Sequence, residues 1–137
     1  MTRFLPTIAA ITLPFSLPLS AAEFELEVPG VADPILVSLP KNHNPAKSWP
    51  AVFSYHGTNG RPNTRSTRSH TGDQDWIVIG MAYIQRGNYQ LESDDIKATL
   101  KVFHHVRDEL VRTQGLDPKR SYVTGHSKGG WMTDTLL

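Results

Sequence analysis

The sequence predicts a single α/β domain whose sheet is mostly parallel and begins with an antiparallel hairpin. Two continuous apolar runs, residues 51–55 and 76–80, are typical of strands buried on both faces of a parallel sheet. A long amphipathic segment, residues 93–114, then leads to a third β-prone run at 121–124. A chain of 137 residues has room for one domain at most.

The hairpin is predicted from the first two β-prone segments. Residues 24–28 alternate apolar and polar side chains, as a half-exposed antiparallel strand does, and Pro29-Gly30 supplies a turn. Residues 35–39 form the second strand. Between the two buried strands, a glycine-rich loop at 56–62 is followed by a short crossover with room for a helical turn.

The segment 93–114 is the clearest helix in the sequence. Ser93 is a suitable N-cap, and Gly115 is a suitable stop signal. The adjacent His104 and His105 lie off the apolar face, so we expect both at the surface. Five apolar side chains recur at helical spacing and predict the buried face: Ile96, Leu100, Phe103, Val106 and Leu110.

Residues 1–22 have the features of an export signal. Arg3 gives a positive start, residues 4–19 are mostly apolar, and the small residues up to Ala22 offer a cleavage site. Prolines within the segment argue against a membrane-spanning helix, and the alternative is a single N-terminal anchor. We therefore expect a mature chain, residues 23–137, that is secreted or periplasmic and has no membrane attachment.

Charge and cysteine content disfavour several classes of partner. The chain has 14 Lys and Arg against 13 Asp and Glu, and loss of Arg3 with the signal would leave 13 of each. A neutral balance gives no electrostatic case for binding nucleic acid or an anionic membrane. Because cysteine is absent, the exported chain must be stabilised by its core, and no cysteine is present to bind a metal.

The strongest functional signal is the G-x-S-x-G pentapeptide at residues 125–129. A nucleophilic serine needs a tight strand-to-helix turn with small neighbours on both sides, which Gly125 and Gly129 provide. β-prone residues precede this turn, and helix-compatible residues follow it. We therefore predict Ser127 as the nucleophile and the backbone N–H of Lys128 as one donor to the oxyanion.

A second oxyanion donor is expected on the loop that follows residues 51–55. The N–H of Thr58 or Gly57 is the candidate, because glycine lets the main chain approach a substrate closely; the alternative is a plain turn. In the same loop, His56 and Arg61 are candidate substrate contacts. The surrounding basic side chains form either a solvated surface or a subsite for an acidic group. They are Arg61, Arg65, Arg68 and His70.

A serine hydrolase also needs a general base, and histidine is the natural one. After the pentapeptide the chain offers Asp134 and no histidine. His56 and His126 lie in the two loops, but adjacency in sequence does not aim an imidazole at the serine hydroxyl. Directly after the pentapeptide, Trp131 and Met132 are predicted to be core residues.

The segment 116–132, L-D-P-K-R-S-Y-V-T-G-H-S-K-G-G-W-M, resembles a known family of esterases. It is similar to the nucleophile region of extracellular polyhydroxybutyrate-depolymerase-like esterases, whose form is D-P-x-R-x-Y-V-T-G-x-S-x-G-G-x-M. That group includes feruloyl and acetylxylan esterase relatives and belongs to the α/β-hydrolase superfamily. The run Trp49 to Phe53 and the helix start at Asp95-Ile96 are similar as well. The resemblance covers roughly residues 35–137.

The resemblance implies the N-terminal part of an α/β-hydrolase fold, truncated after the nucleophile elbow. It implies an exported enzyme that acts on carboxylic esters, polymeric ones included, through an acyl-enzyme on Ser127 and without a cofactor. Lys128 and the Gly57-Thr58 loop carry over as oxyanion donors. The family's acid and histidine lie on later strands, so we expect weak hydrolysis or none from this chain alone.

Two further hypotheses stay open. The chain could be a non-catalytic exported module that binds a polymer or glycan on its loop face, or a fragment of a prolyl-peptidase-like hydrolase, which shares G-x-S-x-G-G. The D-P-K-R lead-in favours the esterase group. In each case the strand at 121–124 would form an open sheet edge, so we expect the isolated chain to aggregate or to pair with missing strands.

Overall fold

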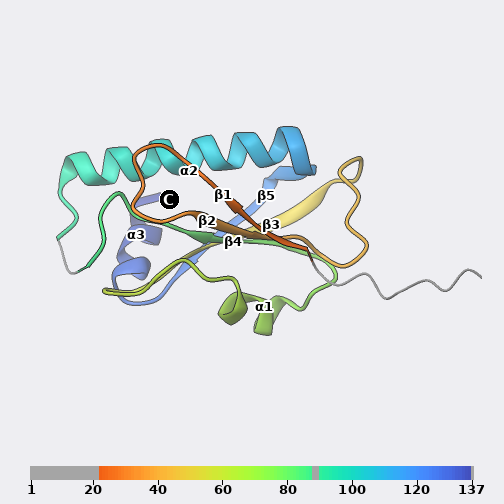
Figure 1. The fold of residues 1–137 in the computed structure, drawn as a ribbon, viewed down its shortest axis with the longest axis horizontal. Helices are drawn as coiled ribbons and strands as arrows, with labels where there is room; N and C mark the ends of the chain where they lie inside the picture. The colour runs from red at the N-terminus through yellow and green to blue at the C-terminus, as the bar shows by residue number, and fades with distance from the viewer. Residues whose placement is uncertain (1–21, 88–89, 137) are drawn as a thin grey trace, which may run out of the picture.

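The computed structural model describes residues 22–87 and 90–136, so the predicted export signal lies outside the described residues except for Ala22. The described chain forms a five-stranded sheet and three helices (Figure 1). The strand order in the sheet is β1-β2-β4-β3-β5. The strands are β1 (Glu23–Leu26), β2 (Ile35–Ser38), β3 (Trp49–Tyr55), β4 (Ile77–Met81) and β5 (Leu116–Gly125).

Strand directions confirm the predicted fold class. β1 and β2 form the antiparallel hairpin, and β2 pairs antiparallel with β4. β4, β3 and β5 run parallel to one another. Parallel neighbours need crossover connections, which is why a helix follows β3 and another follows β4.

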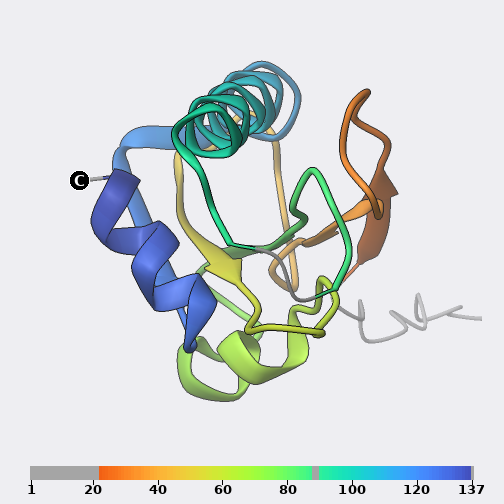
Figure 2. The same ribbon diagram turned by 90° about the vertical axis from the view of Figure 1, so that its left-hand side faces the viewer.

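The helices cover both faces of the sheet. They are α1 (Arg65–Thr71), α2 (Ser93–Gln114) and α3 (Lys128–Leu136). Figure 2 shows α2 across one face of the sheet and α1 below the opposite face. α3 packs against β5, β3 and α2. The expected helical turn in the first crossover is therefore α1, and α3 begins at Lys128, directly after the predicted nucleophile, as expected.

α2 has the predicted bounds, but its buried face differs from the predicted one. Ile96 and Leu100 are half-buried, while the buried residues are Thr99, Val102, Phe103, Val106 and Leu110. The apolar positions of the predicted face are buried from Phe103 onward and only partly covered before it. His104 and His105 are exposed, as predicted.

Both ends of α2 are fixed by local chemistry. The N-cap is Glu92, not Ser93 as predicted, because the Asp95 carboxylate accepts the Glu92 backbone N–H at 3.0 Å and closes a capping box. At the other end Gly115 adopts φ 70°, and a Cβ there would lie 2.2 Å from the Lys47 carbonyl oxygen. Only glycine satisfies both conditions, so the predicted helix stop is confirmed.

The core lies between the sheet and α2. All five residues of β4 are buried, and the Phe53 ring meets the Phe103 ring at 4.7 Å between centroids. In β3, Ser54 is half-buried, so that strand is less covered than predicted. The hydroxyl of Tyr55 is buried and has no hydrogen-bond partner among the described residues.

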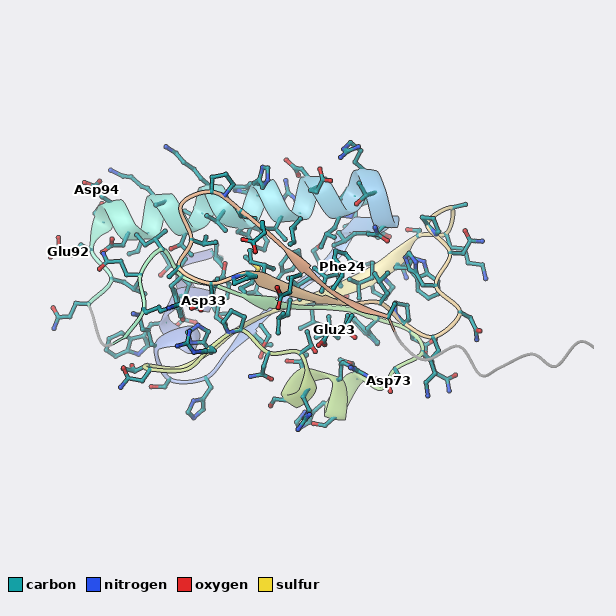
Figure 3. The ribbon with its side chains drawn as sticks, viewed as in Figure 1. Glu23, Phe24, Asp33, Asp73, Glu92 and Asp94 are labelled. Atoms are coloured by element: carbon teal, nitrogen blue, oxygen red, sulfur yellow. The ribbon has the colours of Figure 1, made fainter. Side chains whose placement is uncertain are left out.

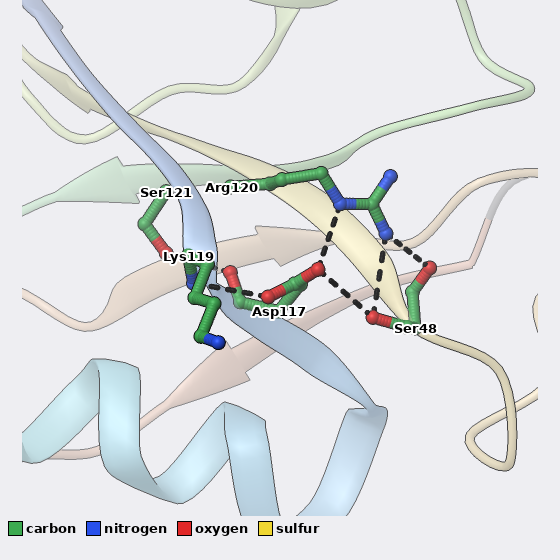
Figure 4. Close-up of polar contacts among 5 residues, drawn as sticks. All are labelled: Ser48, Asp117, Lys119, Arg120 and Ser121. Carbon is green, nitrogen blue, oxygen red and sulfur yellow. Dashed lines mark hydrogen bonds and ion pairs between the residues drawn. The ribbon is translucent and has the colours of Figure 1, made fainter.

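β5 begins at Leu116, earlier than predicted, and an irregularity in its pairing with β3 separates Leu116 from Ser121. Figure 4 shows what holds this lead-in. The Asp117 carboxylate accepts from Arg120 Nε at 2.7 Å, Lys119 N–H at 3.0 Å and Ser48 Oγ at 3.1 Å. The bond from Arg120 is the largest cause that lowers the pKa of Asp117. The D-P-K-R motif thus aligns β5 for its approach to the elbow.

β5 pairs with β3 on one side and is an edge strand of the described sheet. The predicted open edge is therefore present. Across the described helices, no segment is both long and apolar enough to cross a membrane.

Candidate active site

The pentapeptide forms a sharp turn between β5 and α3. Ser127 adopts φ 55°, a left-handed backbone conformation that is strained for a residue with a side chain, and it is exposed. α3 starts at the next residue, Lys128, so the positive end of the helix dipole lies beside the serine. This is the strand–turn–helix geometry that a nucleophile elbow requires.

The two flanking glycines are required because the backbones around them are in close contact. A Cβ on Gly125 would lie 2.2 Å from the Gly129 carbonyl carbon and oxygen, and a Cβ on Gly129 would lie 2.2 Å from the Tyr55 carbonyl oxygen. Gly130 is different, since a Cβ there would meet its nearest neighbour, the Gly125 oxygen, at 3.7 Å. The predicted need for small residues at 125 and 129 therefore has a direct steric cause.

Backbone hydrogen bonds fix the elbow to β3. The His126 N–H donates to the Tyr55 carbonyl at 3.3 Å, which joins the turn to the last residue of β3. Within the turn, Gly129 N–H donates to the His126 carbonyl at 2.9 Å and Gly130 N–H to the Ser127 carbonyl at 2.8 Å. The strained residue is thus held by bonds on both sides.

The loop after β3 lies directly against the elbow. A Cβ on Gly57 would lie 3.5 Å from the Ser127 Cβ and 3.2 Å from His126 Nδ1. The Gly60 N–H donates to the Gly57 carbonyl at 3.0 Å, and Asn59 has φ 58°, so the segment is also a tight turn. Both hypotheses for this loop describe part of it: it is a turn, and it lies beside the predicted nucleophile.

Ser127, Lys128 and Thr58 line one hollow of about 610 Å³. The wall of this hollow also includes Gln90, Leu91, Ile96, Trp131 and Thr135. The prediction that Trp131 is a core residue is wrong, because its side chain is 77% exposed, whereas Met132 is buried as predicted. Successive helical residues point about 100° apart, so α3 buries Met132 and turns Trp131 outward.

His56 and Arg61, the candidate substrate contacts, line a second hollow of about 690 Å³, which Thr58 also borders. His56 donates from Nδ1 to the Gly57 carbonyl at 2.8 Å, and burial is the largest cause that lowers the pKa of this imidazole. Arg61 Nη1 lies 2.6 Å from the Asp33 carboxylate. The structure therefore places these two residues in a different hollow from the one that Ser127 lines.

Carboxylates partly neutralise the basic run around Arg61. Arg68 pairs with Asp73 at 2.7 Å, and His70 Nδ1 bonds to the Ser66 carbonyl at 2.9 Å. Arg65 is exposed. These contacts favour the solvated-surface interpretation over a subsite for an acidic group.

Asp33 is a residue that the sequence analysis did not identify. It lies on the loop between β1 and β2 (Figure 3) and binds Arg61 at 2.6 Å and Arg86 at 2.7 Å. The hydrogen bond from Arg86 is the largest cause that lowers the pKa of Asp33. Because Arg61 follows the Gly57 turn and Arg86 follows β4, this carboxylate joins the hairpin to both loops. No sequence spacing links Asp33 to Arg61 or to Arg86, so the sequence carries no signal for this pair of contacts.

Within residues 22–87 and 90–136, no hydrogen bond joins the Ser127 hydroxyl to a histidine. The same residues contain no group of three His, Cys, Asp or Glu side chains that could hold a metal ion.

Comparisons with known proteins identify the fold. No protein-family model matches the chain, and no curated protein matches it. A CE1 ferulic acid esterase from Anaeromyces mucronatus, solved with ferulic acid, matches with a TM-score of 0.55 and 11% identity over 89% of this chain and 54% of its own. The acetyl xylan esterase from Aspergillus awamori matches with a TM-score of 0.63 and 17% identity over 84% of this chain and 46% of its own.

Thermogutta terrifontis esterase 2, phosphoramylated by tabun, gives a TM-score of 0.59 and 17% identity over 90% of this chain and 48% of its own. The chain has the α/β-hydrolase fold. It spans about half the length of these solved structures. The predicted fold class is therefore confirmed by the strand order and by these matches together.

Proposed function

We propose that this chain carries the nucleophile half of a serine hydrolase that cleaves carboxylic esters. The observation that carries the proposal is the backbone of Ser127, which is exposed and left-handed at the junction of β5 and α3. The Gly57 turn faces it closely, since a Cβ added at Gly57 would lie 3.5 Å from the Ser127 Cβ. A strained, exposed serine is suited to acyl transfer when backbone N–H groups of its own turn and of the facing loop lie beside it.

In this reaction the Ser127 oxygen attacks the carbonyl carbon of an ester. A base takes the hydroxyl proton, and the carbonyl oxygen becomes an oxyanion held by the N–H of Lys128 and of Gly57 or Thr58. The C–O bond to the alcohol then breaks, and the alcohol leaves with the proton. Water hydrolyses the acyl-enzyme by the same steps and regenerates the serine.

We propose that the base and its orienting acid come from polypeptide other than the described residues. The proposal is supported by the lack of a histidine bonded to Ser127 among those residues and by the coverage of the matching esterases, of which this chain spans 54% and 46%. The expected consequence is slow turnover. If the full chain hydrolysed an aryl acetate at about 1–10³ per second, the usual range for enzymes, this part of the proposal would be wrong.

The proposed substrates are acyl esters on polymers, with the alcohol part carried by a polysaccharide or polyester. The names of the matching ferulic acid and acetyl xylan esterases support this class, as does the resemblance at residues 116–132. The apolar side chains of Leu91, Ile96 and Trp131 on the hollow beside Ser127 are suited to an acyl or aryl group.

A fluorophosphonate probe tests the nucleophile directly. The serine oxygen bonds to phosphorus and displaces fluoride, so the label reports the nucleophile itself, and without the base the labelling should be slow but complete in probe excess. We expect the label on Ser127 by peptide mass spectrometry and its loss in Ser127→Ala. Ser93→Ala is the matched control, because Ser93 is also an exposed serine at the start of a helix. A chain that stays unlabelled at Ser127 in probe excess would overturn the proposal.

A second candidate function is a non-catalytic module that binds a polymer or glycan. The observation that favours it is Trp131, an aromatic side chain that is 77% exposed on the rim of the hollow. Under this hypothesis the probe leaves Ser127 unlabelled, while xylan or polyhydroxybutyrate retains the chain and Trp131→Ala abolishes the retention.

We also propose that the mature protein is exported. The charge, apolarity and small residues of the first 22 residues support this. Expression of the full chain in a bacterium, followed by N-terminal sequencing of the exported fraction, should give a chain that starts at Glu23. A product that keeps Met1 and sediments with membranes would favour the anchor instead.

A further inference from the structure

Tyr83 occupies a position between the two parts of the proposed oxyanion site. It lies two residues after β4 and is 3% exposed. Its hydroxyl donates to the His56 carbonyl at 2.9 Å, and its ring meets the His56 imidazole edge-on, with centroids 4.8 Å apart at 87°. Tyr83 therefore holds the start of the loop that follows β3.

The bond to the His56 carbonyl also acts on the next N–H group. The carbonyl of His56 and the N–H of Gly57 belong to one planar peptide unit, and no cis peptide is present among the described residues. In a trans unit the two groups point in opposite directions. A hydroxyl that fixes the carbonyl on one side therefore fixes the direction of the Gly57 N–H on the other.

The Tyr83 ring also receives the side chain of Lys128. Lys128 Nζ lies 4.8 Å from the ring centroid, and the residue is 8% exposed. A cation at this distance is attracted to the ring face. Burial lowers the pKa of Lys128, while the nearby Asp95 charge raises it and so favours the cation. The residue that supplies the first proposed oxyanion donor thus holds the same tyrosine with its side chain.

We propose that Tyr83 is a positioning residue that couples Lys128 on the elbow to Gly57 on the facing loop, and so sets the spacing between the two oxyanion donors. The inference rests on the proposed function for its catalytic meaning. Neither Tyr83 nor the Lys128 side chain touches the reacting atoms under this proposal. Both act through the direction of backbone N–H groups.

The test compares two buried tyrosines in the full chain. Tyr83→Phe removes the hydroxyl that donates to His56, and Tyr55→Phe removes a hydroxyl without a partner among the described residues. With a fluorophosphonate probe we expect Tyr83→Phe to lower the maximal labelling rate about fivefold to tenfold, as loss of one aligned hydrogen bond does. The probe concentration for half-maximal rate should stay within about twofold, because substrate contacts are unchanged. Tyr55→Phe should label like the wild type.

The lysine supplies a second arm. Lys128→Met should slow labelling to a similar degree, and Lys128→Arg, which keeps a cation over the ring, should restore most of the rate. The two contacts act in series through the Tyr83 ring, so loss of either one uncouples Lys128 from Gly57. The double variant Tyr83→Phe/Lys128→Met should therefore be no slower than the slower single variant. The inference would be overturned if the two substitutions slowed labelling by factors that multiply in the double variant, or if Tyr83→Phe labelled at the wild-type rate.

A measurement without the probe separates this inference from the proposed function. In ¹⁵N spectra of the full chain, the Gly57 amide resonance should move more in Tyr83→Phe than in Tyr55→Phe. If the wild type does not label, the proposed function fails, and the spectra still decide whether Tyr83 sets the Gly57 peptide. Equal displacement of that resonance in both variants would contradict the coupling.

Discussion

The left-handed backbone of Ser127 depends on the residues two positions before and after it. Gly129 lies against the Tyr55 carbonyl and Gly125 lies against Gly129, so neither position has space for a Cβ. The elbow is thus fixed by contact between backbones and not by side-chain packing. A substitution at either glycine must move β3, β5 or α3.

Gly129→Ala is expected to destabilise the fold by about 1–3 kcal/mol, the usual cost of inserting a methyl group into a closed space, and to abolish labelling of Ser127. Gly130→Ala is the matched control. Its Cβ would meet the nearest atom at 3.7 Å, and alanine favours a helix more than glycine does. Urea unfolding followed by circular dichroism measures both. Equal stability of the two variants would show that the contact at Gly129 is relieved easily.

Tyr55→Phe is expected to raise the free energy of unfolding by about 1 kcal/mol, because it removes a buried hydroxyl that has no partner among the described residues. Tyr83→Phe should lower the same quantity by a similar amount, since its hydroxyl donates to His56. Opposite signs for two tyrosine-to-phenylalanine changes are the distinctive outcome. A loss of stability in Tyr55→Phe would mean that its hydroxyl has a partner.

The carboxylate of Asp33 gives the fold a dependence on acid. Its folded pKa is lowered, first by the hydrogen bond from Arg86. The stabilisation is therefore fully present above the ordinary aspartate pKa of about 3.9 and is lost as the pH falls through the lower folded value. Asp33→Asn should flatten the dependence of stability on pH below about pH 4. Asp94→Asn, at a side chain 96% exposed, should leave the wild-type dependence unchanged.

At the scale of the element, β5 combines two roles. Its lead-in is held by Asp117, Arg120 and Ser48, and its end delivers Ser127 to the turn. Between them the strand pairs with β3 alone in the described sheet, and Tyr122 is 53% exposed. An unpaired edge with an exposed aromatic residue favours association with another strand.

We expect the purified chain to self-associate as its concentration rises, and Tyr122→Lys to reduce this association. A lysine on an edge strand places charge where a second strand would pair. Tyr122→Phe keeps the aromatic ring and should associate like the wild type. Sedimentation velocity over a range of concentrations measures the effect. A monomer at all concentrations would contradict the prediction.

Regular elements of the molecule could be predicted because their causes are local. Hydrophobic periodicity gave the bounds of α2, and turn chemistry gave the stop at Gly115. The face of α2 was placed wrongly at Ile96 and Leu100, since burial depends on where the helix crosses the sheet. The order of the strands was not predictable from spacing, because β5 pairs with β3 although α1, β4 and α2 lie between them in the chain.

The candidate site was predictable in part for the same reason. Ser127 and Lys128 belong to one contiguous motif, and Gly57 and Thr58 to one loop, so the sequence identifies them. The orientation of Trp131 and the contacts of Tyr83 and Asp33 depend on tertiary structure. Asp33, for example, meets Arg86 across 53 residues of sequence. Such pairs carry no local pattern.

Because β5 pairs on one side only in the described sheet, its successive amides should take up deuterium at alternating rates. Successive N–H groups along a strand point toward opposite edges, so one set of β5 amides faces β3 and the alternate set faces the open side. In D₂O the amides bonded to β3 should exchange slowly and their immediate neighbours quickly. Along residues 121–125 protection would therefore rise and fall with a period of two, and a strand that docked on the open side would remove the alternation.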